Sequence, residues 1–308
     1  MTYTIQLLKM GQCDVMGPEV YWMSHWNDWV QLYFWMAVIR GNGKTAIINT
    51  GPPADLTALN ERWSSGFGER GKLARVDSER PVNALASIGV KPEDVDYVLI
   101  TPIQIYATAN LQLFKNAQVC ISKRGWIEDF HAEKFPMHVP REFRLSDETL
   151  NYLTFEGRER LRLLEDEDEI MPGLRCFWAG VHHRSSMCYV VDTNAGRVGI
   201  SDCLFKYGNL EEGEPLGIQE DQRLLLAERR GQPYREMVSP VMVIVELGEQ
   251  LALHPPRGLT PRHLLRGLGQ GEADRAEPVR GSARGGNARG PALPTNQTFR
   301  SRSRGHGE

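Results

Sequence analysis

The hydrophobic residues of positions 1–255 fall into short blocks with two different periods. Blocks that are continuously apolar or alternate at every second residue are typical of strands, whereas apolar positions three or four residues apart are typical of helices. The first kind predicts strands at 3–8, 32–40, 45–49, 97–101, 117–122, 176–179, 187–192, 197–201 and 241–245. The second kind predicts helices at 82–88, 150–164 and 219–230.

Turn signals between these blocks predict hairpins near both ends of an α/β fold. Gly41-Asn-Gly-Lys separates two strand blocks, and Thr193-Asn-Ala-Gly-Arg separates two more. Glycine and asparagine supply the positive backbone angles that tight hairpin turns need. Gly89 ends the helix at 82–88 in the same way. Hairpins with helices between them predict two sheets that helices cover on the outside.

The segment 21–29 is unusually aromatic. Trp22, Trp26 and Trp29 recur at helix-like spacing, which predicts that they share one face. Such a face would pack onto the body of the protein or onto a second copy of the chain, forming a homodimer. The alternative is a lid over a pocket, in which His25 and Trp26 would contact a ligand.

Composition places the chain among globular proteins. It has 308 residues, of which 41% are hydrophobic and 24% charged. No run approaches the roughly 18 uncharged apolar residues of a membrane helix, and the first residues lack the features of a signal peptide. The five cysteines are scattered and form no CxxC pair. We therefore expect a cytoplasmic protein with no membrane partner.

Charge divides the chain into an acidic body and a basic tail. Residues 261–308 hold nine Arg, no Lys and four acidic residues, a balance of +5, which leaves 27 basic and 35 acidic residues before them, a balance of −8. An acidic body argues against a nucleic-acid partner. The Arg-, Gly- and Pro-rich composition predicts one domain at 1–255 and a disordered tail at 256–308.

Three segments within residues 30–210 resemble a known family. They are Thr45-Ala-Ile-Ile-Asn-Thr-Gly, the helix-turn-strand at 89–101, and Gly180-Val-His-His-Arg-Ser-Ser followed by Ile200-Ser-Asp-Cys. In this order they are similar to the metallo-β-lactamase fold superfamily, especially its lactonase-like hydrolases. The resemblance implies an αββα four-layer sandwich in which these segments carry a strand ending in Asp-Thr-Gly, an HxHxDH metal loop, a later histidine ligand and a bridging aspartate.

The metal-binding positions depart from that pattern. Where the family has HxHxDH, this chain has Pro102, Gln104, Tyr106 and Ala107 at the four ligand positions, and Asn49 replaces the aspartate of Asp-Thr-Gly. Proline and alanine side chains bind no metal, and amide or phenol oxygens are poor ligands for zinc. We therefore expect the fold without the dinuclear zinc site, and no cofactor.

Two histidines and one aspartate remain as candidate catalytic residues. His182 and His183 are adjacent, so in extended backbone their side chains would point to opposite sides. The resemblance puts His183 at the later ligand position and Asp202 at the bridging one. Without metal, Asp202 could orient His183 as an acid–base pair. Arg184 or Lys206 would neutralise the carboxylate.

The replaced loop offers neutral hydrogen-bonding groups. These side chains could satisfy the loop's own backbone or bind a small ligand where metals would otherwise lie. Tyr106 or Lys206 would stabilise negative charge during a reaction. The predicted substrate-binding residues are Gln104, Thr108, Asn110, Arg184, Tyr207, His25 and Trp26.

These residues predict small-molecule binding or metal-independent hydrolysis of a lactone or ester through His183 and Asp202. One alternative is a metal-dependent hydrolase with a single zinc or other divalent ion on His182, His183 and Asp202. Another is an inactive scaffold that dimerises through the tryptophans. A thiol nucleophile at Cys188 or Cys203 is a further alternative, whereas the serines at 185 and 186 lack a GxSxG context.

Overall fold

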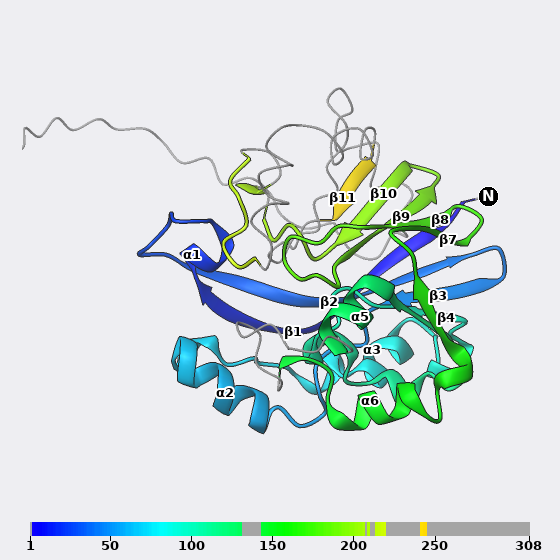
Figure 1. Cartoon of the computed structure of the whole chain (residues 1–308), viewed down its shortest axis with the longest axis horizontal. Helices are drawn as coiled ribbons and strands as arrows, with labels where there is room; N and C mark the ends of the chain where they lie inside the picture. Colours follow the sequence, from blue (N-terminus) through cyan, green and yellow to red (C-terminus); the bar gives the residue numbers. More distant parts are fainter. Residues whose placement is uncertain (1, 131–142, 207, 210–212, 220–240, 245–308) are drawn as a thin grey trace, which may run out of the picture. The chain divides into compact units, whose positions relative to one another are not determined.

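The computed structural model describes residues 2–130, 143–206, 208–209, 213–219 and 241–244. All of them belong to one compact unit, Met1–Gly269 (Figure 1). The predicted tail at 256–308 and nearly all of the predicted helix at 219–230 lie outside the described residues. No helix within the described ranges is long and apolar enough to cross a membrane.

The first sheet has six strands in the order β1-β2-β3-β4-β5-β6. The first three strands pair antiparallel and the last three join in parallel register. Asn42 and Gly43 both have positive φ in the tight turn between β2 and β3, as the sequence predicts. The strands are β1 (Thr4–Met16), β2 (Trp29–Gly41), β3 (Lys44–Ile48), β4 (Tyr97–Leu99), β5 (Gln118–Ser122) and β6 (Leu161–Leu164).

The second sheet has five strands in the order β11-β10-β9-β8-β7. β10 and β11 are parallel, and the other neighbours are antiparallel. The strands are β7 (Glu167–Met171), β8 (Leu174–Trp178), β9 (Met187–Thr193), β10 (Gly196–Ser201) and β11 (Val241–Ile244).

Helices occupy the connections of the first sheet (Figure 1). The α-helices are α1 (Gly17–Val20), α2 (Thr57–Phe67), α3 (Pro81–Ser87), α4 (Ile105–Thr108), α5 (Lys123–Phe130) and α6 (Asp147–Thr154). Short 3₁₀ helices lie at Glu69–Gly71, Asp77–Glu79, Pro92–Asp94, Leu111–Leu113 and Arg158–Arg160.

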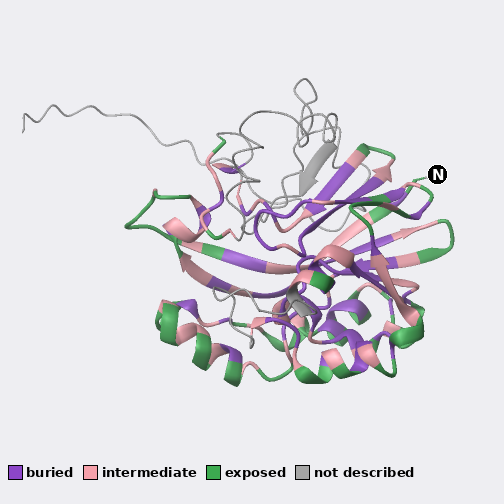
Figure 2. Ribbon diagram, in the orientation of Figure 1, coloured by how far each residue is buried: buried purple, intermediate pink, exposed green. Residues whose placement is uncertain are grey.

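The two faces of the first sheet are buried against different layers (Figure 2). On β2, Met36 and Val38 join a core with residues of α3, α5 and α6, whereas Ala37 and Ile39 join a core with the second sheet. This period of two follows from strand geometry, in which successive side chains point to opposite faces. The sheets therefore face each other, with helices behind the first, and the mixed α/β fold is the predicted one.

The predicted helix at 150–164 is wrong in its second half. α6 ends at Thr154, a 3₁₀ turn follows, and Leu161–Leu164 forms β6. The residues after the turn pair with β5, so tertiary pairing overrides the helical preference of a leucine- and charge-rich segment. The sequence analysis also did not predict α2, α5 and β7.

The tryptophan segment is not a helix. Residues 21–28 form turns with positive φ at Met23 and His25, and Trp29 begins β2. Trp22 is 41% exposed and Trp26 64% exposed, so neither belongs to the core. The prediction that these residues share a helical face is therefore wrong.

Candidate functional site

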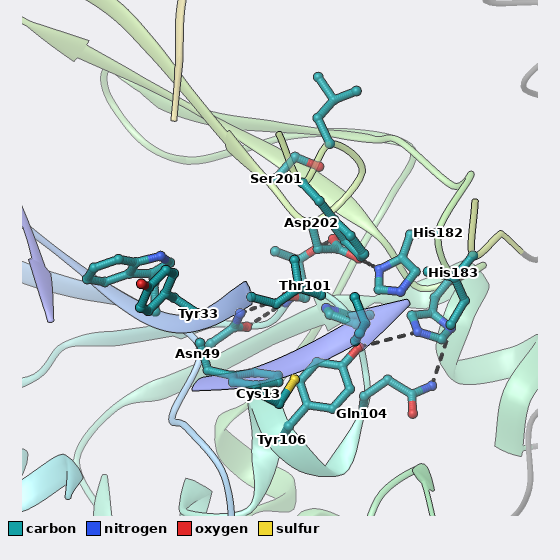
Figure 3. A pocket seen from close by; sticks show the side chains of 18 of the residues that line it. Cys13, Tyr33, Asn49, Thr101, Gln104, Tyr106, His182, His183, Ser201 and Asp202 are labelled. Atoms are coloured by element: carbon teal, nitrogen blue, oxygen red, sulfur yellow. Dashed lines mark hydrogen bonds and ion pairs between the residues drawn. The ribbon is translucent and has the colours of Figure 1, made fainter. Parts of the chain in front are cut away.

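The candidate site lies where loops from both sheets meet at one end of their strands. Thr101 lies just beyond β4, His182 and His183 lie in the loop between β8 and β9, and Asp202 follows β10 (Figure 3). These residues line a cavity of about 500 Å³. The topology thus brings together Thr101 and Asp202, which are 101 positions apart in the sequence.

Asp202 is a largely buried carboxylate with three hydrogen-bond donors. It accepts from His182 Nδ1 at 2.9 Å, from Ser186 Oγ at 2.6 Å and from Thr101 Oγ1. Burial alone would raise the pKa of the Asp202 carboxyl, but the hydrogen bonds from His182, Ser186 and Thr101 hold it below its ordinary value. The carboxylate is therefore ionised at neutral pH and orients one imidazole.

That imidazole belongs to His182 and not to His183, which corrects the predicted pair. The loop is a series of turns with positive φ at Val181, so its backbone is not extended and adjacent side chains do not diverge. The two histidine rings instead lie side by side, with centroids 4.0 Å apart. His182 takes the position beside Asp202 that the sequence analysis gave to its neighbour.

His183 meets the loop that follows β4. Its Nδ1 lies 3.5 Å from Gln104 Nε2, and its Nε2 lies 3.4 Å from Tyr106 Oη (Figure 3). Gln104, Tyr106 and both histidines line the cavity. The structure therefore brings together His182, His183, Asp202, Gln104 and Tyr106, as the sequence analysis expects.

Thr108 and Asn110 satisfy backbone groups. Thr108 Oγ1 donates to the Gln104 carbonyl at 2.8 Å. Asn110 Nδ2 donates to the carbonyls of Thr50, Gly51 and Pro52, at 2.9–3.0 Å. Neither side chain is among the described residues that line the cavity. Both therefore hydrogen-bond the backbone and do not bind a ligand in the cavity.

The remaining predicted residues lie away from the cavity. Lys206 Nζ donates to the Gln31 carbonyl at 2.7 Å, and Arg184 Nε lies 4.0 Å from Glu128. Neither Lys206 nor Arg184 is among the described residues that line the cavity, so neither neutralises Asp202.

The predicted ligand contacts of the aromatic segment are corrected in the same way. His25 Nδ1 lies 2.8 Å from Asp28 and its Nε2 lies 3.5 Å from Glu214, at the surface. His25 and Trp26 do not line the cavity in the described part of the chain. Tyr207 lies outside the described residues.

The cysteines and serines considered as nucleophiles have structural roles. Burial raises the pKa of the Cys188 thiol to about 12, which suppresses the thiolate. Cys203 Sγ donates to the Gly180 carbonyl at 3.1 Å. Ser185 Oγ accepts from the Ile103 N–H at 2.9 Å, and fully buried Ser186 donates to Asp202.

Aromatic rings form much of the cavity wall, and the sequence analysis did not predict this. Phe34 lies 5.3 Å from Tyr106 and 5.9 Å from Trp63, measured between ring centroids. All three rings line the cavity, together with Phe67 and Phe143. Their source elements are distant in sequence, and only the aromatic block at 33–35 gave a local signal.

The residues at this site do not fit the zinc pair that the sequence resemblance implies. Pro102 and Ala107 present no donor atom, and Asn49 Nδ2 donates to the Thr101 carbonyl at 2.7 Å, so its amide is oriented by backbone. Asp202 already accepts three hydrogen bonds. Within the described ranges, no three His, Cys, Asp or Glu side chains gather in a way that could hold a metal ion, including the set proposed for a single ion.

Comparisons with known proteins agree on the architecture. No protein-family model matches the sequence. An N-acyl homoserine lactonase from Bacillus cereus is 20% identical over 250 residues, covering 80% of this chain and 93% of that protein. The structure of an N-acyl homoserine lactone hydrolase with N-hexanoyl-L-homoserine at its catalytic metal centre has a TM-score of 0.62 at 16% identity, covering 80% of this chain and 93% of that one.

A second similar structure is described by its superfamily. A hydrolase of the β-lactamase superfamily has a TM-score of 0.55 at 16% identity, covering 79% of this chain and 86% of that one. These likenesses show that the chain shares the fold of lactonase-like hydrolases.

Proposed function

We propose that this protein is a metal-independent hydrolase of a small lactone or ester. The observation that carries the proposal is the His182–Asp202 pair at the wall of a largely apolar cavity. An ionised carboxylate that accepts from Nδ1 leaves Nε2 as the basic nitrogen of the imidazole. The lactonase-like relatives support the choice of an acyl substrate.

The chemistry needs only water and substrate. His182 Nε2 takes a proton from a water molecule as the water oxygen adds to the carbonyl carbon, and the carbonyl oxygen gains the negative charge. The C–O bond of the ester then breaks, and the imidazolium returns the proton to the leaving oxygen. The products are a carboxylic acid and an alcohol, joined in one hydroxy acid when the substrate is a lactone.

Neutral donors at the same cavity would stabilise the charged intermediate. Tyr106 Oη and the Gln104 amide both belong to the loop after β4 and both contact His183. Gln104 is 2% exposed, so its position is fixed by packing before a substrate arrives. Preorganised donors stabilise developing charge more than mobile water does.

The test is hydrolysis after removal of metal. The protein, dialysed against a strong chelator, is assayed with p-nitrophenyl butyrate, p-nitrophenyl hexanoate and a panel of γ- and δ-lactones. We expect turnover to persist after chelation and kcat/KM to fall by about 100-fold or more in His182→Gln, the range that general base catalysis supplies. His25→Gln, which changes a surface histidine outside the cavity, serves as the matched control.

Two outcomes would contradict the proposal. Loss of turnover on chelation, with recovery on adding zinc, would assign the reaction to a metal site. Binding of these compounds without turnover would leave a ligand-binding protein.

A further inference from the structure

The charged side chains of the cavity are unbalanced. Its described lining residues include two carboxylates, Glu19 and Asp202, and no lysine or arginine. Asp202 is compensated by its three donors. Glu19 is therefore the carboxylate whose charge the cavity itself does not offset.

Glu19 lies on α1 and is about half-buried. No hydrogen bond or ion pair of its side chain occurs anywhere in the described structure. Burial raises the pKa of the Glu19 carboxyl, because the charged form loses hydration without gaining a partner. A desolvated carboxylate without a partner is costly, so a protein retains one where a ligand compensates it.

Gln219 is a second polar side chain without a partner at the same end of the cavity. Its Oε1 and Nε2 are both buried and make no hydrogen bond. The backbone joins it to Glu19, because Ile218 N–H donates to the Glu19 carbonyl at 2.7 Å and Gly217 N–H donates to the Val20 carbonyl at 3.2 Å. Burial of an amide without a hydrogen-bond partner is unfavourable. Both residues line the cavity.

We propose that Glu19 and Gln219 form a subsite for the protonated amine of a ligand whose apolar part fills the cavity. An ammonium group supplies several N–H donors, which suit the Glu19 carboxylate and Gln219 Oε1, and its charge offsets that of the carboxylate. The inference deepens the proposed function, on whose cavity it rests, by naming the substrate class as an ester or lactone that carries a basic amine.

The aromatic wall suits the same ligand. Phe34 and Trp63 pack against the apolar cluster that contains Val20, the residue after Glu19. Both rings also line the cavity. Aromatic faces attract a desolvated cation and also bury an aliphatic chain. An anionic ligand would be repelled, because the described residues that line the cavity include two carboxylates and no lysine or arginine.

The test compares probes of one length and three charges. Binding of hexylamine, 1-hexanol and hexanoate to the full chain at neutral pH is measured by calorimetry and by tryptophan fluorescence, which Trp35 and Trp63 in the wall can report. None of these probes can be hydrolysed, so the result is independent of the proposed reaction. We expect hexylamine to bind at least about tenfold more tightly than 1-hexanol, and hexanoate to bind most weakly, as the pairing of one charge predicts.

Variants then locate the preference. Glu19→Gln should bring the amine-to-alcohol affinity ratio close to one while 1-hexanol binding stays unchanged, which also shows that the variant is folded. Gln219→Leu should lower the same ratio to a smaller extent. Glu61→Gln, an exposed glutamate on α2, is the matched control and should keep the wild-type ratio.

The inference is overturned if hexylamine binds no more tightly than 1-hexanol, if neither binds, or if Glu19→Gln keeps the preference. In contrast, a retained amine preference with no ester turnover would contradict the proposed hydrolysis and leave the subsite standing.

Discussion

Asp202 shows how much of this site rests on one buried charge. Its carboxylate has three donors from two separate segments, Thr101 after β4 and the pair His182 and Ser186 in the loop between β8 and β9. Through these hydrogen bonds the Asp202 carboxylate links the two sheets and also orients the His182 imidazole. Asp202 therefore contributes both to the free energy of unfolding and to the proposed reaction. Its contribution to the free energy of unfolding depends on pH, because it requires the charged carboxylate.

Asp202→Asn should remove a pH-dependent part of the stability. The folded pKa of Asp202 lies below its ordinary value, so its contribution to the free energy of unfolding is full above about pH 4 and is lost as the pH falls through the folded pKa. Because an amide cannot accept from all three donors as a carboxylate does, we expect a loss of roughly 3 kcal/mol at neutral pH. Urea unfolding at pH 7 and pH 3 measures the difference.

The control for this experiment is an exposed carboxylate. Glu156→Gln removes a carboxylate outside the site, at the surface after α6. If Asp202→Asn loses as much stability at pH 3 as at pH 7, the carboxylate charge is not what the three donors stabilise.

At the scale of elements, Asn49 connects the ends of β3 and β4. Its Nδ2 donates to the Thr101 carbonyl at 2.7 Å, and its Oδ1 accepts from the Thr101 N–H at 2.9 Å. Its φ of 64° is a conformation that asparagine tolerates better than most residues. An aspartate could accept from the amide but could not donate to the carbonyl, so the asparagine suits this role as a structural clamp.

Asn49→Asp should therefore destabilise the fold although it changes one atom. The Thr101 carbonyl would lose its donor, and the new charge would lie near Asp202, so we expect a loss of roughly 1–3 kcal/mol. Thermal unfolding measures it, and Asn194→Asp, in the exposed turn between β9 and β10, is the matched control. Equal melting temperatures for the two variants would show that the clamp contributes little.

At the scale of the whole molecule, the tryptophans divide between core and surface. Trp126 on α5 is 8% exposed and packs in the core behind the first sheet, whereas Trp26 is 64% exposed in the turns before β2. Trp126 lies among the charged residues of 123–129 and Trp26 among the aromatic residues of 21–29, so local composition does not predict which one is buried. Their difference comes from which segments the sheets bring together.

Substituting these two tryptophans should have unequal effects. Trp126→Ala leaves a large cavity in a packed core and should cost roughly 3–5 kcal/mol, whereas Trp26→Ala should stay within roughly 0.5 kcal/mol of the wild type. Denaturant unfolding of both variants under the same conditions measures the contrast. A large loss for Trp26→Ala would mean that the exposed turns are covered in the folded protein.

The sequence by itself determined most of the strands, the hairpins and the fold, because period-two patterns and turn residues are local and the order of segments survives divergence. It also predicted a departure from the HxHxDH pattern at 102–107, a prediction that depends on residue type alone. It could not assign Asp202 to His182, because that choice depends on a turn at Val181 that brings adjacent rings side by side. Nor could it reveal the subsite of Glu19 and Gln219, since only tertiary folding joins α1 to residues 217–219 and removes both side chains from water.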